Sequence, residues 1–312
     1  GHINLLGIEE VIAPIQAGTP EYPYHYPAFY DVLQRARDLG GLVGPAHGTA
    51  LGRSPSGIAD TILGAVDFFE IANTHLYKTD VWYRLMNCGY VVPPAAGTDL
   101  PNYPFRDPWQ PLLGEVRTYV RTGGKTNFDS FKLAVKRGEV FVSGGPMIEI
   151  TVNGVGPGGS VRLPKGGDEI HVTAELSGPR PLAAFEVLCN SESLIVPIQK
   201  TMDGPVHRWR IDQRVRVDRS SWLAARGTGI EKQALQKHTG IRQHTMAHTA
   251  AVRVLVADEP IRSARDAKFL IQHLRDQIEI YQAQAKYREP ENRDRALGFF
   301  QSAIAELEWQ VD

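Results

Sequence analysis

Residues 138–152, Gly-Glu-Val-Phe-Val-Ser-Gly-Gly-Pro-Met-Ile-Glu-Ile-Thr-Val, mark the point at which the pattern of this 312-residue chain changes. Before Gly144-Gly145-Pro146, short apolar runs alternate with segments whose apolar residues recur every three or four positions. After it, apolar and polar residues alternate, as they do from Ile148 to Val152. The first pattern is typical of βαβ units and the second of half-buried strands. We therefore expect an α/β part followed by an all-β part.

The α/β part, residues 1–145, has the order of a mainly parallel sheet with helices between its strands. Asn127 is a suitable N-cap and Gly138 a suitable stop, which predicts a helix between them. Apolar faces predict two more helices, one at about residues 29–39 and one at 79–87. The predicted strands are 3–8, 42–46, 67–72, 90–96, 115–120 and 139–143.

The all-β part, residues 146–257, predicts a β sandwich, because short strand-like runs recur at close spacing. The runs are 148–152, 170–176, 183–188, 194–198, 209–217, 222–225 and 251–256. Residues 258–312 predict a helical hairpin that packs on the preceding domains. Ser263 and Asp266 resemble a capping box at the start of the first helix, and the second helix carries an apolar stripe, Leu297, Phe300, Ile304, Leu307 and Val311.

Composition narrows the class of partner. Lys plus Arg (34) almost cancels Asp plus Glu (35), so no net charge favours nucleic acid or a membrane surface. We expect a small-molecule substrate and make no prediction of oligomeric state. The sequence shows no bilayer-spanning run and no targeting segment, which predicts a soluble protein, cytoplasmic or exported. Cys88 and Cys189 lack a partner cysteine at ligand spacing, and we expect buried free thiols.

Three potential metal ligands lie beside short apolar runs. They are His2, His47 after Gly44-Pro45-Ala46, and Asp99 after Ala95-Ala96-Gly97-Thr98. Strand ends of α/β folds deliver side chains into one pocket, and mixed His and Asp ligands suit Zn, Mn or Fe. Each residue also has a structural interpretation: His47 can be a hydrogen-bonded core histidine, and Asp99 can cap a turn.

Four further residues are candidates for substrate contact or support. Glu70 could orient a metal-bound histidine or be a surface or edge carboxylate, and Asn73 and His75 could face substrate or solvent. Arg117 could clamp an anion or form an internal salt bridge. We expect His75 and Arg117 to act in catalysis.

A second group of histidines, His238, His244 and His248, lies in the all-β part. His244 and His248 are four positions apart, but His-Thr-Met-Ala-His lacks the glutamate of the zinc-peptidase motif. We therefore expect loop or substrate contacts from this group and no metal binding.

Taken in order, these segments resemble the PHP (polymerase and histidinol phosphatase) superfamily of metal-dependent hydrolases, in its CehA/McbA, carbaryl-hydrolase-like branch. The resemblance covers nearly the whole chain. It rests on the segments 1–7, Pro45-Ala46-His47, 67–73, 87–90, Ala96-Gly97-Thr98-Asp99, 117–120, Ser143-Gly144-Gly145-Pro146, 221–226 and Ala247-His248-Thr249.

The resemblance implies a distorted β/α barrel whose strand ends hold two or three divalent metals, followed by a β sandwich and C-terminal helices. His2, His47 and Asp99 match the later ligand positions. The earlier ones, a His-x-His pair, a Thr-Asp-His strand end and a glutamate, are expected to precede Gly1, so residues 1–145 would be a partial, N-terminally truncated barrel. Many relatives read Asp-x-His at the last motif, whereas this chain has Asp99-Leu100-Pro101. That departure implies fewer metals or a different ligand.

The implied function is hydrolysis of an ester, carbamate, amide or phosphoester by metal-activated water. Asp99 and the histidines would bind metal, and Arg117 or His75 would steady the developing anion. We expect the chain on its own to retain metal poorly. The alternative is a non-catalytic binding protein that uses Trp209 and Trp222 of the sandwich to hold a saccharide or polymer.

Overall fold

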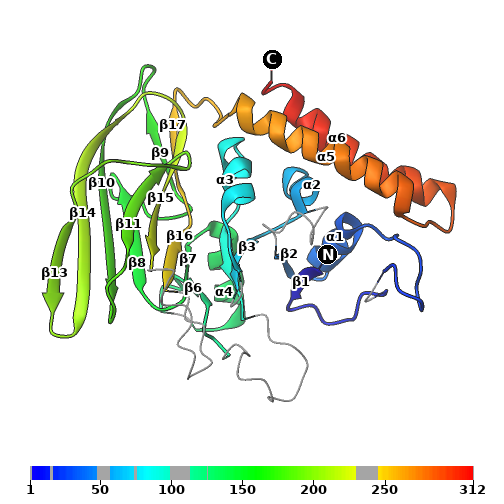
Figure 1. Cartoon of the computed structure of the whole chain (residues 1–312), viewed down its shortest axis with the longest axis horizontal. Coiled ribbons are helices and arrows are strands. Elements are labelled where there is room, and N and C mark those ends of the chain that lie inside the picture. The colour runs from blue at the N-terminus through cyan, green and yellow to red at the C-terminus, as the bar shows by residue number, and fades with distance from the viewer. Residues whose placement is uncertain are drawn as a thin grey trace. The chain divides into compact units, whose positions relative to one another are not determined.

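The computed structural model describes residues 2–14, 17–47, 57–73, 76–98, 113–124, 126–229 and 245–311. This part of the chain contains six α-helices and several β-sheets, one of them large and mixed, so the class is mixed α/β (Figure 1). None of the sheets formed by these residues closes into a barrel. The chain divides into two compact units, one of Gly1–Phe69, Asp80–Val92 and Arg262–Asp312, the other of Glu70–Thr79 and Pro93–Ile261.

In the first unit, a two-stranded sheet packs against one helix. Strand β1 (His2–Leu6) pairs in antiparallel register with β2 (Leu42–Ala46), which is buried along its whole length. Helix α1 (Phe29–Asp38) packs on them through Leu33 and Ala36, which are fully buried with Val43. Gly44 of β2 lies so close to the next segment that a Cβ would sit 2.3 Å from the carbonyl oxygen of Phe68. Only glycine fits there, so this contact fixes how closely the chain can pack.

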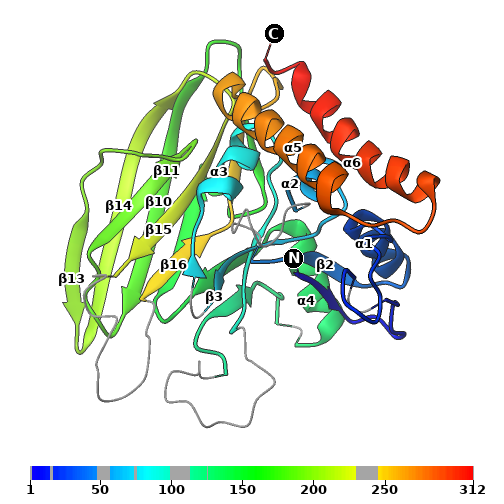
Figure 2. The same ribbon diagram turned by 45° about the vertical axis from the view of Figure 1, so that its right-hand side comes forward.

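The described part of the first unit contains four further helices that contact one another. They are α2 (Gly57–Ile62), α3 (Asp80–Asn87), α5 (Ala264–Gln284) and α6 (Pro290–Glu308). The predicted hairpin is confirmed: α5 and α6 lie side by side in both views (Figures 1 and 2), and they contact α3 and α2. Ser263 caps α5 by accepting the backbone N–H of Asp266, as the sequence predicted. Helix α6 ends before Val311.

The second unit contains the larger sheets. The eight-stranded sheet has the order β12-β11-β15-β16-β7-β6, with β17 joining β15 to β9, and the four-stranded sheet has the order β13-β14-β10-β8. A third sheet has the order β4 (Leu76–Tyr77), β3 (Phe69–Asn73) and β5 (Pro94–Ala96). The strands of the two large sheets are β6 (Arg117–Val120), β7 (Val140–Ser143), β8 (Met147–Val152), β9 (Ser160–Leu163), β10 (Asp168–Gly178), β11 (Ala184–Cys189), β12 (Glu192–Ser193), β13 (Gln199–Asp203), β14 (Val206–Val217), β15 (Ser221–Thr228), β16 (Met246–Thr249) and β17 (Val252–Val256). Helix α4 (Phe128–Arg137) lies between β6 and β7, capped by Asn127 and ended by Gly138 as predicted.

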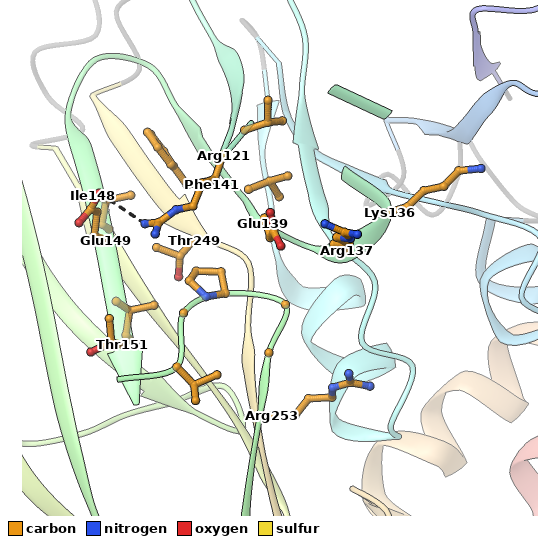
Figure 3. A pocket seen from close by; sticks show the side chains of 18 residues that line it. Arg121, Lys136, Arg137, Glu139, Phe141, Ile148, Glu149, Thr151, Thr249 and Arg253 are labelled. Atoms are coloured by element: carbon orange, nitrogen blue, oxygen red, sulfur yellow. Dashed lines mark ion pairs between the residues drawn. The ribbon is translucent and has the colours of Figure 1, made fainter. Parts of the chain in front are cut away.

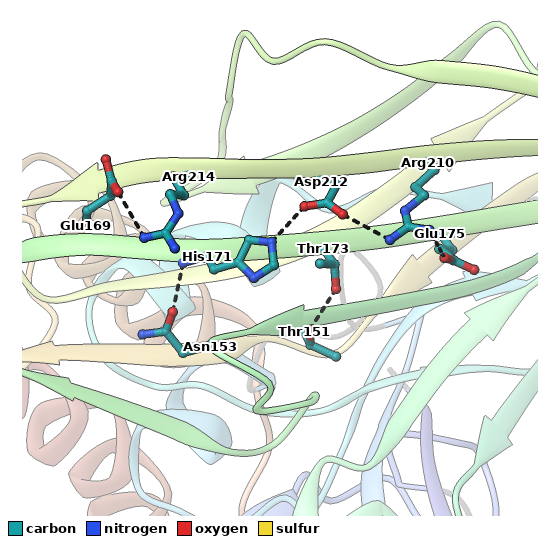
Figure 4. Close-up of polar contacts among 9 residues, drawn as sticks. All are labelled: Thr151, Asn153, Glu169, His171, Thr173, Glu175, Arg210, Asp212 and Arg214. Carbon is teal, nitrogen blue, oxygen red and sulfur yellow. Dashed lines mark hydrogen bonds and ion pairs between the residues drawn. The ribbon is translucent and has the colours of Figure 1, made fainter.

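Alternation along the strands separates a core from a polar face. The apolar residues that alternate in β8, β10 and β14 are buried with residues of β11, β15 and β17, so the two large sheets share one core. The opposite face of β10 and β14 carries charged ladders (Figure 4). Arg214 pairs with Glu169 at 3.2 Å, and Asp212 lies between His171 and Arg210 at 2.7 and 2.9 Å. This face is therefore a solvated surface.

Several predictions of this pattern were wrong. Instead of being parallel, the pairs β1–β2, β3–β4 and β6–β7 are antiparallel. Residues 194–198, predicted as a strand, lie outside the strands, and Ile195 is fully exposed. Helix α2 and strands β4, β9, β12, β13 and β16 were not predicted from the sequence. The strand predicted at residues 90–96 is the shorter β5, which begins only at Pro94.

Candidate functional site

His2 and His47 are brought together by the antiparallel pairing of β1 and β2. His2 begins β1 opposite Ala46, the last residue of β2, and His47 follows directly. His2 Nδ1 lies 3.4 Å from His47 Nε2, and the two rings are tilted by 58°. His47 is buried and has a left-handed backbone with φ of +53°, whereas His2 is exposed. The histidines therefore meet at one end of the sheet, with one ring reachable from solvent.

The spacing of this pair fits two ligands of one metal ion. Two nitrogens bound at about 2.0–2.1 Å with a tetrahedral angle between them lie about 3.3–3.4 Å apart. The observed separation of 3.4 Å matches that value. It also suits a hydrogen bond between a protonated and an unprotonated ring nitrogen. The pair thus has the donor chemistry and the spacing for a metal, but two nitrogens make half of a tetrahedral set.

A third ligand is not found in the described part of the chain. Among these residues no group of three or more His, Cys, Asp or Glu side chains could hold a metal ion. Asp99 and His75, both predicted site residues, lie outside the described residues, as do His238 and His244. The metal assignment of Asp99 and the catalytic assignment of His75 therefore stay predictions.

Glu70 and Asn73 lie on β3 of the second unit, and both are buried. The amide of Asn73 donates a long hydrogen bond of 3.5 Å to Glu70 Oε1. The interpretation of Glu70 as a surface carboxylate was therefore wrong, and Asn73 belongs to a strand instead of a loop. An amide that donates to a buried carboxylate fixes its position. A carboxylate fixed in this way could accept a hydrogen bond from a metal-bound histidine and orient its ring, as predicted for Glu70.

Arg117 begins β6 in the second unit and is exposed. Its guanidinium donates to the hydroxyl of Tyr119 at 3.3 Å, and no ion pair involves it among the described residues. It lines a cavity of about 390 Å³ together with Arg180, Glu115 and the Gly144-Gly145-Pro146 turn. The internal salt bridge considered for Arg117 is thus not seen there, and the side chain is available to an anion.

His248 was predicted to act in a loop, and this prediction was wrong. It lies in β16, between β15 and β7, and is fully buried. Its Nδ1 lies 2.7 Å from the carbonyl oxygen of Thr249, which only an N–H at that position satisfies. Burial lowers the pKa of His248 to about 3, so the ring is neutral at physiological pH. It is a structural histidine.

A larger cavity of about 770 Å³ lies in the second unit beside β7, β8 and α4 (Figure 3). Its apolar lining includes Phe141, Ile148, Ile150 and Val155, and a glycine-rich turn, residues 156–159, borders it. The charged lining residues are Arg121, Lys136, Arg137, Arg253, Glu139 and Glu149. Arg121 lies 3.9 Å from Glu149, while Arg137 and Arg253 have no ion pair among the described residues. Such a lining favours an anionic group over a cationic one.

This cavity was not predicted from the sequence, because its lining comes from seven separate stretches between Val120 and Arg253 with no common motif. Trp209 and Trp222 do not offer a stacking platform, since their exposed fractions are 5% and 0%. Cys88 and Cys189 are free thiols as predicted, the first buried and the second half-buried. Burial raises the pKa of the Cys88 thiol to about 12, so neither its environment nor its charge state suits a nucleophile.

No family model matches the chain, and no curated protein matches it. Among the described helices, none has both the length and the apolar character that a membrane crossing requires.

Proposed function

We propose that the chain belongs to a metal-dependent hydrolase and that His2 and His47 bind one divalent ion. The observation that carries the proposal is the 3.4 Å separation of the two ring nitrogens, which equals the spacing of neighbouring nitrogens around a tetrahedral metal. Asp99 is proposed as the next ligand. The metal class is Zn, Mn or Fe, since imidazole and carboxylate together suit all three.

A divalent ion held there would supply Lewis acidity, which would make a water molecule acidic enough to act as nucleophile near neutral pH. The two histidines hold the ion through nitrogens, and the burial of His47 keeps that ring in place. Arg117 is proposed to bind an anionic part of the substrate or the developing oxyanion, because its five N–H donors have no carboxylate partner in the described residues. The substrate class is an ester, carbamate, amide or phosphoester.

We also propose the finer architecture. The first unit and the small β4-β3-β5 sheet would belong to a distorted PHP-type β/α barrel, and the two large sheets that share one core would be a β sandwich. The resemblance in motif order supports both assignments, and the shared core supports the second.

A metal titration tests the proposal. Two imidazoles and one carboxylate predict weak binding by the 312-residue chain, so Co²⁺ would be titrated by absorbance and Zn²⁺ by competition with a weak chelator. We expect one site that is lost in His2→Ala, His47→Ala and Asp99→Ala but kept in His171→Ala, which removes an exposed histidine of the other unit. Hydrolysis of chromogenic esters and phosphoesters would be measured with Zn²⁺, Mn²⁺ or Fe²⁺ added. Unchanged metal binding in His47→Ala would contradict the proposed centre.

A further inference from the structure

The cavity of about 770 Å³ beside β7, β8 and α4 is lined only by residues of the second unit. Its size falls within the range of about 300–1,000 Å³ that is usual for sites of small molecules. Four apolar side chains of the lining are half-buried and so keep part of their surface accessible: Val120, Phe141, Val155 and Pro157. The cavity therefore offers an apolar surface to the body of a small molecule.

A glycine-rich turn, residues 156–159, lies between two arginines of the lining, Arg137 at the end of α4 and Arg253 on β17. A Cβ on Gly158 would lie 1.9 Å from the carbonyl oxygen of Arg137, so the backbones of these two residues lie directly against each other. The carbonyl oxygen of Gly159 accepts the backbone N–H of Arg253 at 3.0 Å. The turn thus contacts both arginines, and Figure 3 shows their side chains at the same side of the cavity.

The charges of the lining favour an anion. Arg121 lies 3.9 Å from Glu149, so these two charges largely cancel. Arg137 and Arg253 form no ion pair among the described residues, and the described lining contains one further carboxylate, that of Glu139. Two arginines and one carboxylate leave a net positive charge. A guanidinium can also donate two parallel hydrogen bonds to a carboxylate or phosphate.

Helix stability does not account for both arginines. Arg137 lies in the last turn of α4, where a positive charge stabilises the helix with or without a ligand. Lys136 shares that turn and has other interactions, so its charge is not counted here. Arg253, by contrast, is exposed between two buried valines of a strand, and no carboxylate of the described residues pairs with it. Its charge has no structural partner in this part of the chain.

We propose that this cavity binds an organic anion, whose carboxylate or phosphate group is held by Arg137 and Arg253 and whose apolar body lies against Phe141 and Val155. The proposal concerns residues of the second unit alone and does not depend on the proposed metal centre. An exposed guanidinium contributes little by itself. Two of them acting on one group beside an apolar surface favour an anion over a neutral molecule of the same shape.

The test compares 8-anilinonaphthalene-1-sulfonate with N-phenyl-1-naphthylamine, which is the same fluorescent body without the sulfonate group. The sulfonate stands in for a carboxylate or phosphate. Both dyes fluoresce more strongly outside water, so binding to the full chain is measured by fluorescence titration. We expect the sulfonate to bind at least about tenfold more tightly, because only the anion gains from the two arginines. Equal binding of the two dyes would overturn the proposal.

Competition then identifies the anionic group. Octanoate or octyl phosphate should displace the bound sulfonate, and the one that does so at the lower concentration carries the preferred group. Octan-1-ol has the same apolar chain without the charge and should displace the dye at least about tenfold less effectively. Displacement by the alcohol at the same concentration as by the two anions would contradict an anion site.

Variants locate the site. Arg137→Gln and Arg253→Gln each remove one charge, and each should weaken binding of the sulfonate at least about threefold without changing that of the naphthylamine. Glu139→Gln removes the opposing charge and should tighten binding of the sulfonate. Arg162→Gln is the matched control, because Arg162 is exposed, pairs with Asp258 and lies outside the lining. If Arg137→Gln unfolds, as judged by circular dichroism, the strand variant Arg253→Gln decides the outcome. Unchanged binding in the folded arginine variants would place the dye elsewhere and overturn the assignment.

Discussion

His2 and His47 are 45 positions apart in sequence, yet their ring nitrogens lie 3.4 Å apart because β1 runs antiparallel to β2. Strand direction is decisive for this contact. With β1 parallel to β2, the first residue of β1 would lie at the opposite end of the sheet from the residue that follows β2. The expected parallel sheet was wrong. The two histidines lie side by side, and their role as metal ligands stays a prediction.

The backbone at His47 predicts which replacements the chain tolerates. Its φ of +53° is left-handed, a region that asparagine enters readily and β-branched residues avoid. We expect His47→Val to lower the free energy of unfolding by about 1–2 kcal/mol more than His47→Asn does. Urea denaturation of the metal-free proteins measures the difference. Equal stabilities would show that the left-handed backbone imposes no such selection.

Gly158 offers a sharper steric test. It has φ of +82°, and a Cβ there would lie 1.9 Å from the carbonyl oxygen of Arg137. Gly154 has nearly the same φ, +78°, but nothing within 4 Å of the added atom. We expect Gly154→Ala to lower the free energy of unfolding by about 1 kcal/mol, because of the left-handed backbone alone. Gly158→Ala adds the steric clash and should lower it by at least about 2 kcal/mol more. Similar unfolding midpoints would mean that the turn moves aside freely.

One aspartate, Asp266, accepts several hydrogen bonds at the start of α5, so we expect its removal to lower the free energy of unfolding strongly. Asp266 accepts hydrogen bonds from Arg84 at 2.6 Å, Asn87 at 2.9 Å and Ser263 at 3.0 Å. Asp266→Ala leaves those donors without their acceptor in a largely buried place, and we expect a cost of about 2–4 kcal/mol. Asp276→Ala, on the exposed face of the same helix, is the control and should cost about 0.5 kcal/mol or less. Urea denaturation compares the two, and equal losses would argue against the network.

The features that the sequence predicted correctly depend on local signals. Helix α4 begins at Asn127 and ends at Gly138, because a side-chain cap and a left-handed stop act within a few residues of the helix itself. The alternation in β8 and β10 likewise records one buried and one exposed face. Helix α2 was not predicted because all six of its residues are buried, Asp60 and Thr61 included, so its short sequence does not separate an apolar from a polar face with a helical period.

Only those site residues could be predicted that carry a local signal in the sequence. Histidine beside an apolar strand is a visible signal, which is why His2 and His47 were identified. The direction of pairing depends on contacts distant in sequence, so their geometry was not predictable. The burial of His248 was hidden for the same reason, since β16 is covered by strands on both edges.

That burial makes His248 a source of acid sensitivity. Its pKa is lowered from 6.5 to about 3 by desolvation, so between these values the unfolded chain binds a proton that the native chain does not. Stability contributed by the neutral ring is complete above about pH 6.5 and is lost as the pH falls toward 3. From pH 7 to pH 5 the loss should reach about 2 kcal/mol, at 1.36 kcal/mol for each unit below the unfolded pKa.

His248→Gln removes this titration while keeping a polar side chain of similar reach. The variant is less stable at pH 7, since the glutamine must repack beside Thr249, but its stability should fall less on acidification than that of the parent chain. All other titrating groups are common to both proteins, so their contributions cancel in the comparison. The free energies of unfolding in urea at pH 7 and pH 5 measure this: the gap between the two proteins should narrow by about 2 kcal/mol. A gap that stays constant would mean that the imidazole is hydrated or protonated in the native state, contrary to its full burial.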